Sequence, residues 1–372
     1  MKVLTVVGTR PEIIRLSRVM VALDEYVEHV VVHTGQNYDY ELSQIFFDDL
    51  SLRKPDYFLD AAGLNAVSTL AAIISKLDDV YEKERPDATL ILGESNSCLA
   101  TYAAKRRKIP IFHVDAGKRA YDQRVPEEIN RRLIDCLADV NMPCSSVARD
   151  NLLHEGFPLE RVFQITSPMR EVFFHYADKI ESSDVLTRLG VRKREYFVVS
   201  VHREENVDDA RQLESLVETL NFLAETERKP VVFSVHPRTR KRLEASALKL
   251  APTIKLLRPL GFHDYNALQK NAFAVLSDSG ALDEESAILD FPAISLRYTR
   301  ERCEIDESSG AIMTGVERAR VADALEIIKR KKRVERDFRS VFTEQDLRVS
   351  ERIAQIVISY ADYVDRFVWH KK

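Results

Sequence analysis

Short apolar runs rich in β-branched residues alternate with helical patterns along the whole chain. This alternation favours parallel sheets, because a crossover helix must carry the chain back before the next strand can run in the same direction. The sequence therefore predicts an α/β protein. Its strands are expected in two series, at Val3–Val7, Val30–His33, Thr89–Leu92, Ile109–Val114 and Val162–Thr166, then at Tyr196–Val201, Val231–His236, Ile254–Leu257, Ala274–Ser277 and Ala293–Leu296.

Between the two series lies a polar stretch, 178–195, which carries Gly190 and is a candidate linker. We therefore predict two Rossmann-like, doubly wound domains, 1–180 and 181–345, that face each other across a cleft. A last helical pattern within 346–372 is expected to pack back across the junction. Within the first domain, helices are predicted near 12–24, 65–84, 96–107, 127–138 and 145–155.

The composition excludes several classes of protein. With 372 residues, 45% of them hydrophobic and 31% charged, the chain is typical of a soluble globular protein of two domains. No apolar run is long enough to span a membrane and the amino terminus leads straight into a strand, so we expect a cytoplasmic location. A net charge of −4 argues against nucleic acid as a partner. The cysteines show no metal-ligand spacing and are expected to be reduced.

The stretch from Phe273 to Arg297 reads as strand, tight turn, helix and strand. Its turn, with Ser279 and Gly280, offers backbone N–H groups and a hydroxyl at a helix N-terminus, where an anion is favoured. The acidic residues that follow, including Glu285, would repel a phosphate but could accept hydrogen bonds from sugar hydroxyls. An ordinary helix N-terminus with acids placed for its dipole remains the alternative.

Other polar clusters follow predicted strands at the same end of each sheet. Any one of them could be a solvated strand end, but together they predict a site. The absence of GxGxxG after a strand, and of GxxxxGK[ST], disfavours a dinucleotide or P-loop ligand. Arginines for a diphosphate, with carboxylates for proton transfer, suit a nucleoside-diphosphate sugar. The clusters are GTRPE with Arg10, GESNS with Glu94, HVDAGKR with Asp115, RVPEEINRR with Glu127, Glu128 and Arg131, SVHREEN with His202 and Arg203, and SVHPRTR with His236 and Arg238.

At these residues the sequence resembles the non-hydrolysing UDP-N-acetylglucosamine 2-epimerases, through nearly its whole length. The matching segments, in order, are GTRPE, TGQNYDYEL (34–42), the Gly93 and Asp115 loops, VPEEINRR, HREEN, HPRTR, LGFHDYNALQ (260–269) and SDSGALDEES. Four of the segments resemble one branch of the family more than the others, the branch that forms UDP-N-acetyl-L-fucosamine for capsule and O-antigen synthesis. They are TGQNYDYEL, YDQRVPEE, HPRTR and PLGFHDYN. The resemblance implies a fold like that of glycosyltransferase B.

The resemblance also implies the reaction: anti elimination of UDP, a 2-acetamidoglycal intermediate, and re-addition after protonation from the other face. It requires no metal or nicotinamide. It implies a homodimer, with UDP-N-acetylglucosamine as a possible effector. By motif, Glu94, Asp115 and Glu127 are the acid/base candidates, with His202 beside the diphosphate. The predicted UDP-sugar-binding residues are Arg10, Arg15, Arg131, Arg203, His236, Arg238, Ser279, Gly280 and Glu285.

The chain departs from the family pattern at the two acids. The family has Asp where Glu94 stands and Glu where Asp115 stands, so the two acid lengths are exchanged. Lys118 replaces Asn or Leu and brings a cation within reach of Asp115. ERCEIDE (301–307) breaks the family's ERPEG turn, and Thr166 stands where Gly is usual. Three interpretations remain. The changes could compensate each other for another sugar, or the chain could be a catalytically impaired UDP-sugar-binding protein or a glycosyltransferase of the same architecture.

Overall fold

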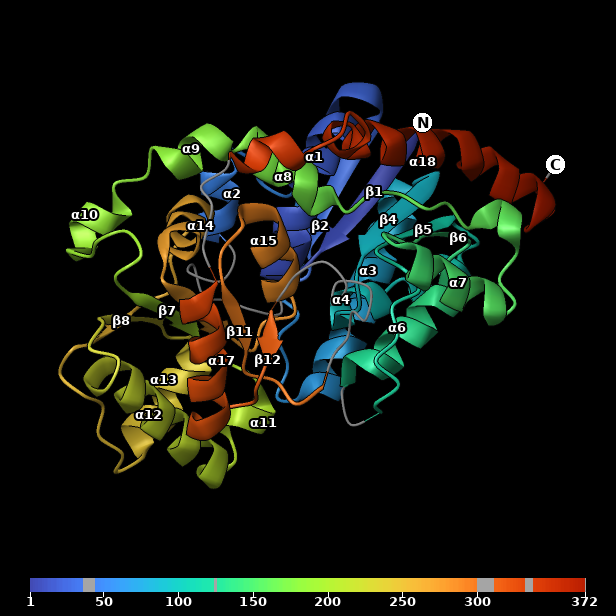
Figure 1. Ribbon diagram of the computed structural model, residues 1–372. Coiled ribbons are helices and arrows are strands. Elements are labelled where there is room, and N and C mark those ends of the chain that lie inside the picture. Colours follow the sequence, from blue (N-terminus) through green and yellow to red (C-terminus); the bar gives the residue numbers. More distant parts are fainter. Residues whose placement is uncertain (36–43, 124–125, 300–310, 332–336, 372) are drawn as a thin grey trace. The chain divides into compact units, whose positions relative to one another are not determined.

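The computed structural model describes residues 1–35, 44–123, 126–299, 311–331 and 337–371. The chain folds into two compact units. The first comprises Met1–His175 together with Phe342–Lys372, and the second comprises Tyr176–Val341. The final helix α18 (Val349–Phe367) therefore belongs to the first unit, where it packs against α1 (Arg10–Tyr26), as Figure 1 shows.

The first unit is built on a parallel six-stranded sheet in the order β3-β2-β1-β4-β5-β6. Its central strands are buried along their whole length, because crossover helices cover both faces of such a sheet. The strands are β1 (Lys2–Val7), β2 (Glu28–His33), β3 (Tyr57–Phe58), β4 (Ala88–Leu92), β5 (Ile111–Val114) and β6 (Val140–Met142). The other helices are α2 (Gln44–Asp49), α3 (Ala66–Glu84), α4 (Asn96–Leu99), α5 (Tyr102–Arg106), α6 (Pro126–Leu137), α7 (Ser146–His154), α8 (Pro168–His175) and the short 3₁₀ helices η2 (Leu159–Arg161) and η4 (Gln345–Leu347).

The second unit has a parallel sheet in the order β12-β11-β10-β7-β8-β9. Its strands are β7 (Phe197–Ser200), β8 (Val231–Ser234), β9 (Ile254–Leu257), β10 (Ala274–Ser277), β11 (Ala293–Ser295) and β12 (Ile312–Met313). Its helices are α9 (Ala177–Glu181), α10 (Val185–Leu189), α11 (Glu204–Val207), α12 (Ala210–Glu225), α13 (Pro237–Ala245), α14 (Phe262–Asn271), α15 (Leu282–Leu289), α17 (Arg318–Arg330) and η3 (Phe338–Val341).

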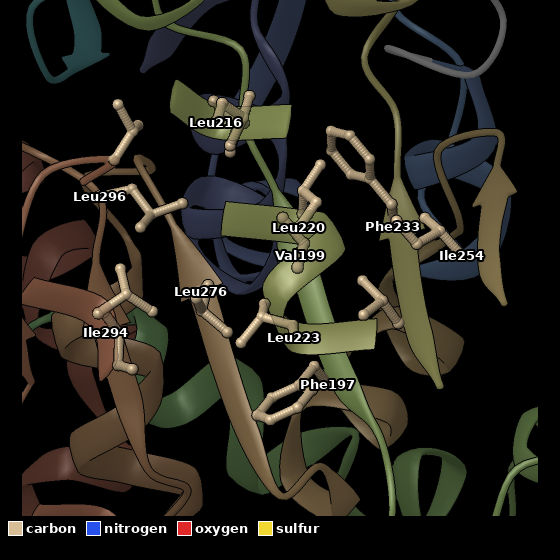
Figure 2. Packing of buried hydrophobic residues seen from close by; sticks show 14 of the residues in the cluster. Phe197, Val199, Leu216, Leu220, Leu223, Phe233, Ile254, Leu276, Ile294 and Leu296 are labelled. Atoms are coloured by element: carbon tan, nitrogen blue, oxygen red, sulfur yellow. The ribbon is translucent and has the colours of Figure 1, made fainter. Parts of the chain in front are cut away.

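The core of the second unit shows how such a sheet is stabilised. Figure 2 shows Leu216, Leu220 and Leu223 of α12 stacked over strand residues such as Val199 and Leu276. The three leucines follow helical spacing, so one face of α12 covers the sheet. Each such side chain contributes about 1.5–3 kcal/mol when it leaves water.

Both sheets have the same strand order once the second is counted from β7, and that order is 3-2-1-4-5-6. The fold class predicted from the sequence, α/β with two Rossmann-like doubly wound domains, is confirmed. In such a sheet the chain reverses its direction of winding between its first and fourth strands, and a ligand binds beyond their carboxyl ends. These switch points lie between β1 and β4 and between β7 and β10.

The structure corrects two predicted elements. Val162–Thr166 is not a strand: it forms one isolated bridge to β6, at Val162, because Pro143 has no N–H to continue the ladder. The predicted helix 96–107 is broken into α4 and α5, where the Thr101 hydroxyl donates to the Cys98 carbonyl at 2.6 Å. Strands β3, β6 and β12 were missed, because two or three residues carry no readable periodicity.

Most of TGQNYDYEL and the whole of ERCEIDE lie outside the described residues. Within the residues that are described, no helix combines the length and the apolar character needed to cross a bilayer.

Gly117 offers a test of how the loop after β5 packs against α7. It has φ +81°, and a Cβ placed on it would lie 2.2 Å from the carbonyl oxygen of Ala148. We expect Gly117→Ala to lower the free energy of unfolding by about 3 kcal/mol or more, because backbone must move as well as adopt a strained φ.

Gly156→Ala is the matched control. Gly156 has φ +88°, but a Cβ placed on it would meet no neighbouring atom within 4 Å. The Gly156→Ala variant should lose only about 1–2 kcal/mol of its free energy of unfolding, which is the cost of a left-handed backbone conformation for alanine. Urea unfolding of both variants measures the difference, and equal losses would show that the Ala148 contact does not constrain the loop.

Candidate active site

The loops after β1 and β4 approach each other at the switch point of the first sheet. Gly8 permits this approach, since a Cβ there would lie 2.0 Å from Thr34 Oγ1 and 2.1 Å from Ser97 Oγ. Gly93 opens the second loop with φ +83°, a conformation that favours glycine. The backbone turns that carry Arg10 and Glu94 are thereby placed side by side, although more than eighty residues separate them.

A network of carboxylates and cations lies at this edge of the sheet. Asp115 Oδ2 pairs with Arg15 Nη1 at 2.5 Å and also contacts Lys118 Nζ. Glu94 lies 3.5 Å from Lys118 Nζ and 3.7 Å from Arg131 Nη2. The cation that the sequence placed near Asp115 therefore contacts both predicted acids.

The two acids differ in how firmly they are held. The Asp115 side chain is 3% exposed and lies against Arg15 and Lys118, whereas the Glu94 side chain is 20% exposed and lies 3.5 Å from Lys118 and 3.7 Å from Arg131. Asp115 also has φ +65°, an uncommon backbone conformation for a residue other than glycine. Backbone strain of this kind gathers at functional sites. Glu94 is the acid that solvent reaches more readily.

Helix α6 supplies the third acid candidate. Glu127 and Glu128 both lie in its first turn, as the sequence predicted. Glu127 is half-buried, while Glu128 is fully buried and pairs with Arg131 at 2.9 Å and Arg132 at 3.2 Å. Glu128 also accepts a hydrogen bond from the Ala120 N–H at 2.8 Å. Glu128 is thus the structural anchor that holds Arg131 toward Glu94.

A buried ion-pair cluster supports the Asp115 loop from below. Asp135 has no exposed side-chain surface, and its carboxylate lies 2.9 Å from His113 Nδ1 and 2.8 Å from Arg119 Nη1. It also accepts a hydrogen bond from the Gly117 N–H at 3.2 Å. Both ends of the loop after β5 are therefore attached to one carboxylate on α6.

In the second unit, Asp278 organises the switch point. This residue follows β10, is completely buried, and accepts hydrogen bonds from the backbone N–H groups of His202 and Arg203 and from Asn206 Nδ2. Burial by itself would raise the pKa of Asp278. The charge and hydrogen bond of His202, with the Arg203 and Asn206 donors, outweigh burial and hold that pKa at about 2.

His202 is oriented by this carboxylate. Its Nδ1 lies 3.1 Å from Asp278 Oδ1, and the side chain stays 32% exposed. The His236 ring lies 5.6 Å away, centroid to centroid, and His236 Nδ1 accepts a hydrogen bond from the Arg238 N–H at the start of α13. Arg238 itself pairs with Glu204 at 2.7 Å. The structure thus brings four of the predicted residues, His202, Arg203, His236 and Arg238, to one edge of this unit.

The turn before α15 carries the remaining predicted residues of this unit. Ser279 and Gly280 are half-buried, and the Ser279 hydroxyl accepts from the Ala281 N–H at 3.3 Å. Glu285 lies in the first turn of α15 and accepts a hydrogen bond from Gln269 Nε2 at 2.8 Å. A buried amide on α14 thereby fixes the direction of Glu285.

Comparison with known proteins places this geometry in a family. The family profile described as UDP-N-acetylglucosamine 2-epimerase matches residues 21–358. A structure of UDP-N-acetylglucosamine 2-epimerase from Rickettsia bellii is 44% identical, with a TM-score of 0.88 and 100% of both chains covered. The chain belongs to the UDP-N-acetylglucosamine 2-epimerase family.

Two further relatives show the range of this family. The Methanocaldococcus jannaschii UDP-GlcNAc 2-epimerase, solved in complex with UDP-GlcNAc and UDP, is 33% identical with a TM-score of 0.89, over 96% of this chain and 100% of that chain. The UDP-2,3-diacetamido-2,3-dideoxy-D-glucuronate 2-epimerase of Pseudomonas aeruginosa is 34% identical, over 87% of this chain and 91% of that protein. The glycosyltransferase-B-like class predicted for this epimerase-family chain agrees with these matches.

Glu12 is a buried acid that the sequence interpretation overlooked. Its Oε2 accepts hydrogen bonds from the N–H groups of Gly8, at 2.6 Å, and Thr9, at 2.9 Å. The turn after β1, where a Rossmann fold often binds phosphate, is thus satisfied by a carboxylate of the protein itself. The T-x-x-E capping pattern from Thr9 to Glu12 was the available signal.

Asp135 and Asp278 were also overlooked, and Glu128 was recognised only as an acid in the first turn of a helix; each of the three acts through partners on other loops or helix turns. A pairing of Glu128 with Arg131 could have been found from their helical i, i+3 spacing. For Asp135 and Asp278 there was no such signal, because the residues that they contact lie outside their own helix or turn and are not marked by any sequence spacing.

Burial raises the pKa of Glu12 to about 7, although hydrogen bonds from Ser95, Gly8 and Thr9 oppose the shift. In the unfolded chain Glu12 ionises near its ordinary pKa, so the folded state holds the extra proton between about pH 4.5 and 7. The free energy of unfolding should therefore fall across this window as pH rises, by about 3 kcal/mol from Glu12 alone.

Glu12→Gln removes this dependence, since an amide stays neutral and can still accept from Gly8 and Thr9. From pH 5 to pH 8, we expect the free energy of unfolding of Glu12→Gln to rise relative to that of the unaltered protein. Urea unfolding at each pH measures it. Glu25→Gln, an exposed glutamate on the same helix, is the control. Parallel pH profiles for the Glu12 variant and the parent would contradict the assignment.

Proposed function

We propose that the protein is a UDP-sugar 2-epimerase that inverts C2 of a UDP-N-acetylhexosamine. The observation that carries this proposal is the network joining Glu94 and Asp115 to Arg15, Lys118 and Arg131 at the carboxyl edge of the first sheet. It supplies paired acids in a chain that belongs to a family of 2-epimerases.

The chemistry of C2 explains why two acids and a diphosphate site are needed. The C2 proton lies next to no carbonyl group that could stabilise a carbanion. Elimination solves this problem: a base takes the C2 proton, the C1–O bond breaks with its electron pair going to UDP, and a C1=C2 double bond forms. Protonation at C2 from the opposite face and return of UDP to C1 then give the epimer.

Within the first unit, we assign proton transfer at C2 to Glu94 together with Glu127. Glu94 is the more exposed of the paired acids, so its carboxylate can reach a bound sugar. Asp115, enclosed by Arg15 and Lys118, acts as the charged anchor of the group. General acid–base groups in such positions contribute about 10²- to 10⁴-fold in rate.

Within the second unit, we assign UDP binding to Arg203, Ser279, Gly280 and Glu285, with His202 facing the diphosphate. The Glu285 carboxylate suits a ribose, because it can only accept hydrogen bonds. Arg10 and Arg131 are the candidates of the first unit for binding UDP or its sugar. This division places affinity for UDP mainly in one unit and proton transfer mainly in the other.

For the sugar, we propose UDP-2-acetamido-2,6-dideoxy-L-talose, giving UDP-N-acetyl-L-fucosamine for a surface polysaccharide. The motifs YDQRVPEE and HPRTR support this choice. UDP-N-acetylglucosamine is the alternative substrate, supported by the relatives that carry its name. We also propose a homodimer on which UDP-N-acetylglucosamine can act as an effector.

Exchange of the C2 proton in D2O tests the activity directly. We expect deuterium to enter C2 of the preferred UDP-sugar and the C2 epimer to appear. NMR spectroscopy measures both. Binding of the sugar without any exchange, for both candidate substrates, would refute the epimerase and favour a silent UDP-sugar-binding protein. Glu94→Asp combined with Asp115→Glu, which restores the usual acid lengths, would then be expected to create activity.

His202→Asn tests the role of the second unit. Asparagine keeps a hydrogen-bond donor but cannot carry the charge that stabilises the departing diphosphate, so kcat should fall about 100-fold or more. Affinity for UDP should fall much less, because the charge matters most in the transition state. His154→Asn, an exposed histidine at the end of α7, controls for the loss of an imidazole elsewhere. Unchanged turnover with a lowered melting temperature would assign His202 a packing role only.

A further inference from the structure

Lys118 lies between the two paired acids of the first unit. It follows Asp115 by three residues in the loop after β5, and its side chain is only 7% exposed. Its Nζ contacts Asp115 Oδ2 and lies 3.5 Å from Glu94 Oε2. One buried ammonium group therefore bridges carboxylates that come from the loops after two different strands, β4 and β5.

The backbone that carries Lys118 is fixed at several points. Arg119 Nη1 donates to the Lys118 carbonyl at 2.5 Å, and Asn151 Nδ2 donates to the Gly117 carbonyl at 3.0 Å. Arg119 is held in turn by Asp135, at 2.8 Å. The backbone that carries Lys118 is thereby attached to α7 and α6.

The bridge is asymmetric. On the Asp115 side, Arg15 already supplies a close counter-ion at 2.5 Å, and the Asp115 N–H donates to the Met142 carbonyl at 3.0 Å. On the Glu94 side, Lys118 and Arg131 lie farther from the carboxylate, at 3.5 Å and 3.7 Å. Neutralising Asp115 therefore does not require a second cation, whereas holding Glu94 near Asp115 does, because two carboxylates repel each other.

We propose that Lys118 is a positioning residue, anchored on Asp115, that holds the carboxylate of Glu94 where it exchanges the C2 proton. The inference rests on the epimerase function proposed above. Lys118 neutralises the repulsion between the two acids, and its long contact leaves Glu94 able to move toward the sugar. It contributes to turnover rather than to affinity, because UDP is held by other residues.

Two variants separate charge from proton transfer. Lys118→Met keeps most of the side-chain volume but no charge, and we expect kcat to fall about 10- to 100-fold, the cost of misplacing a reacting group. KM for the UDP-sugar should stay within about threefold, because transition-state placement and not ground-state binding is lost. Lys118→Arg keeps the charge but cannot transfer a proton, and should recover a substantial part of kcat. If both variants lack turnover with UDP affinity intact, Lys118 takes part in proton transfer itself and the positioning role is wrong.

Lys105→Met is the matched control for breaking a lysine–aspartate pair. Lys105 Nζ pairs with the buried Asp139 at 2.6 Å in the same unit. We expect both Met variants to lower the melting temperature, but only Lys118→Met to lower kcat. A normal kcat for Lys118→Met would overturn the proposal.

A crystal structure of Lys118→Met provides a readout that does not depend on turnover. We expect the Glu94 carboxylate to move by roughly 1 Å or more, a shift large enough to affect catalysis. An unmoved Glu94 would overturn the positioning role even if the unaltered protein proved inactive. Absence of C2 exchange by the unaltered protein would instead refute the epimerase function, so the two failures are distinguishable.

Discussion

The pairing of β1 with β4, and of β7 with β10, is the constraint on which the rest of the structure depends. Parallel strands need crossover helices, and these crossovers are right-handed. Because the strands are added first toward one edge of the sheet and then toward the other, neighbouring loops separate at one point in each sheet and leave a gap there. Polar groups gather at these gaps because the strands on either side are buried over nearly their whole length. Each unit therefore concentrates its chemistry at one edge.

The two switch points solve the problem of buried charge in different ways. In the first unit, Glu94 and Asp115 are balanced by cations from three separate elements, through Arg15, Lys118 and Arg131. In the second unit, the carboxylate of Asp278 is balanced by backbone N–H groups, by the Asn206 amide and by one histidine. A fixed carboxylate of this kind suits the orientation of a single imidazole.

The sequence already located most of the candidate site, because residues that follow predicted strands must share one edge of a parallel sheet. Arg10, Glu94 and Asp115 in the first series, and His202 and Ser279 in the second, lie where strand ends were predicted. Their roles remain a proposal. Which partners hold them was not predictable: Asp278 and His202 meet only because β10 is inserted beside β7, seventy-six residues away.

By itself, the sequence determined the fold class, through the alternation of strand and helix patterns, and the family, through motifs spaced along the whole chain. The tertiary structure decided the order of strands, the depth of burial and the charge partners of each acid. It showed that Glu12 is buried against the turn after β1 and that Lys118 bridges two acids. The physical reason is that local propensity acts over a few residues, whereas desolvation and ion pairing depend on groups that only the folded chain brings together.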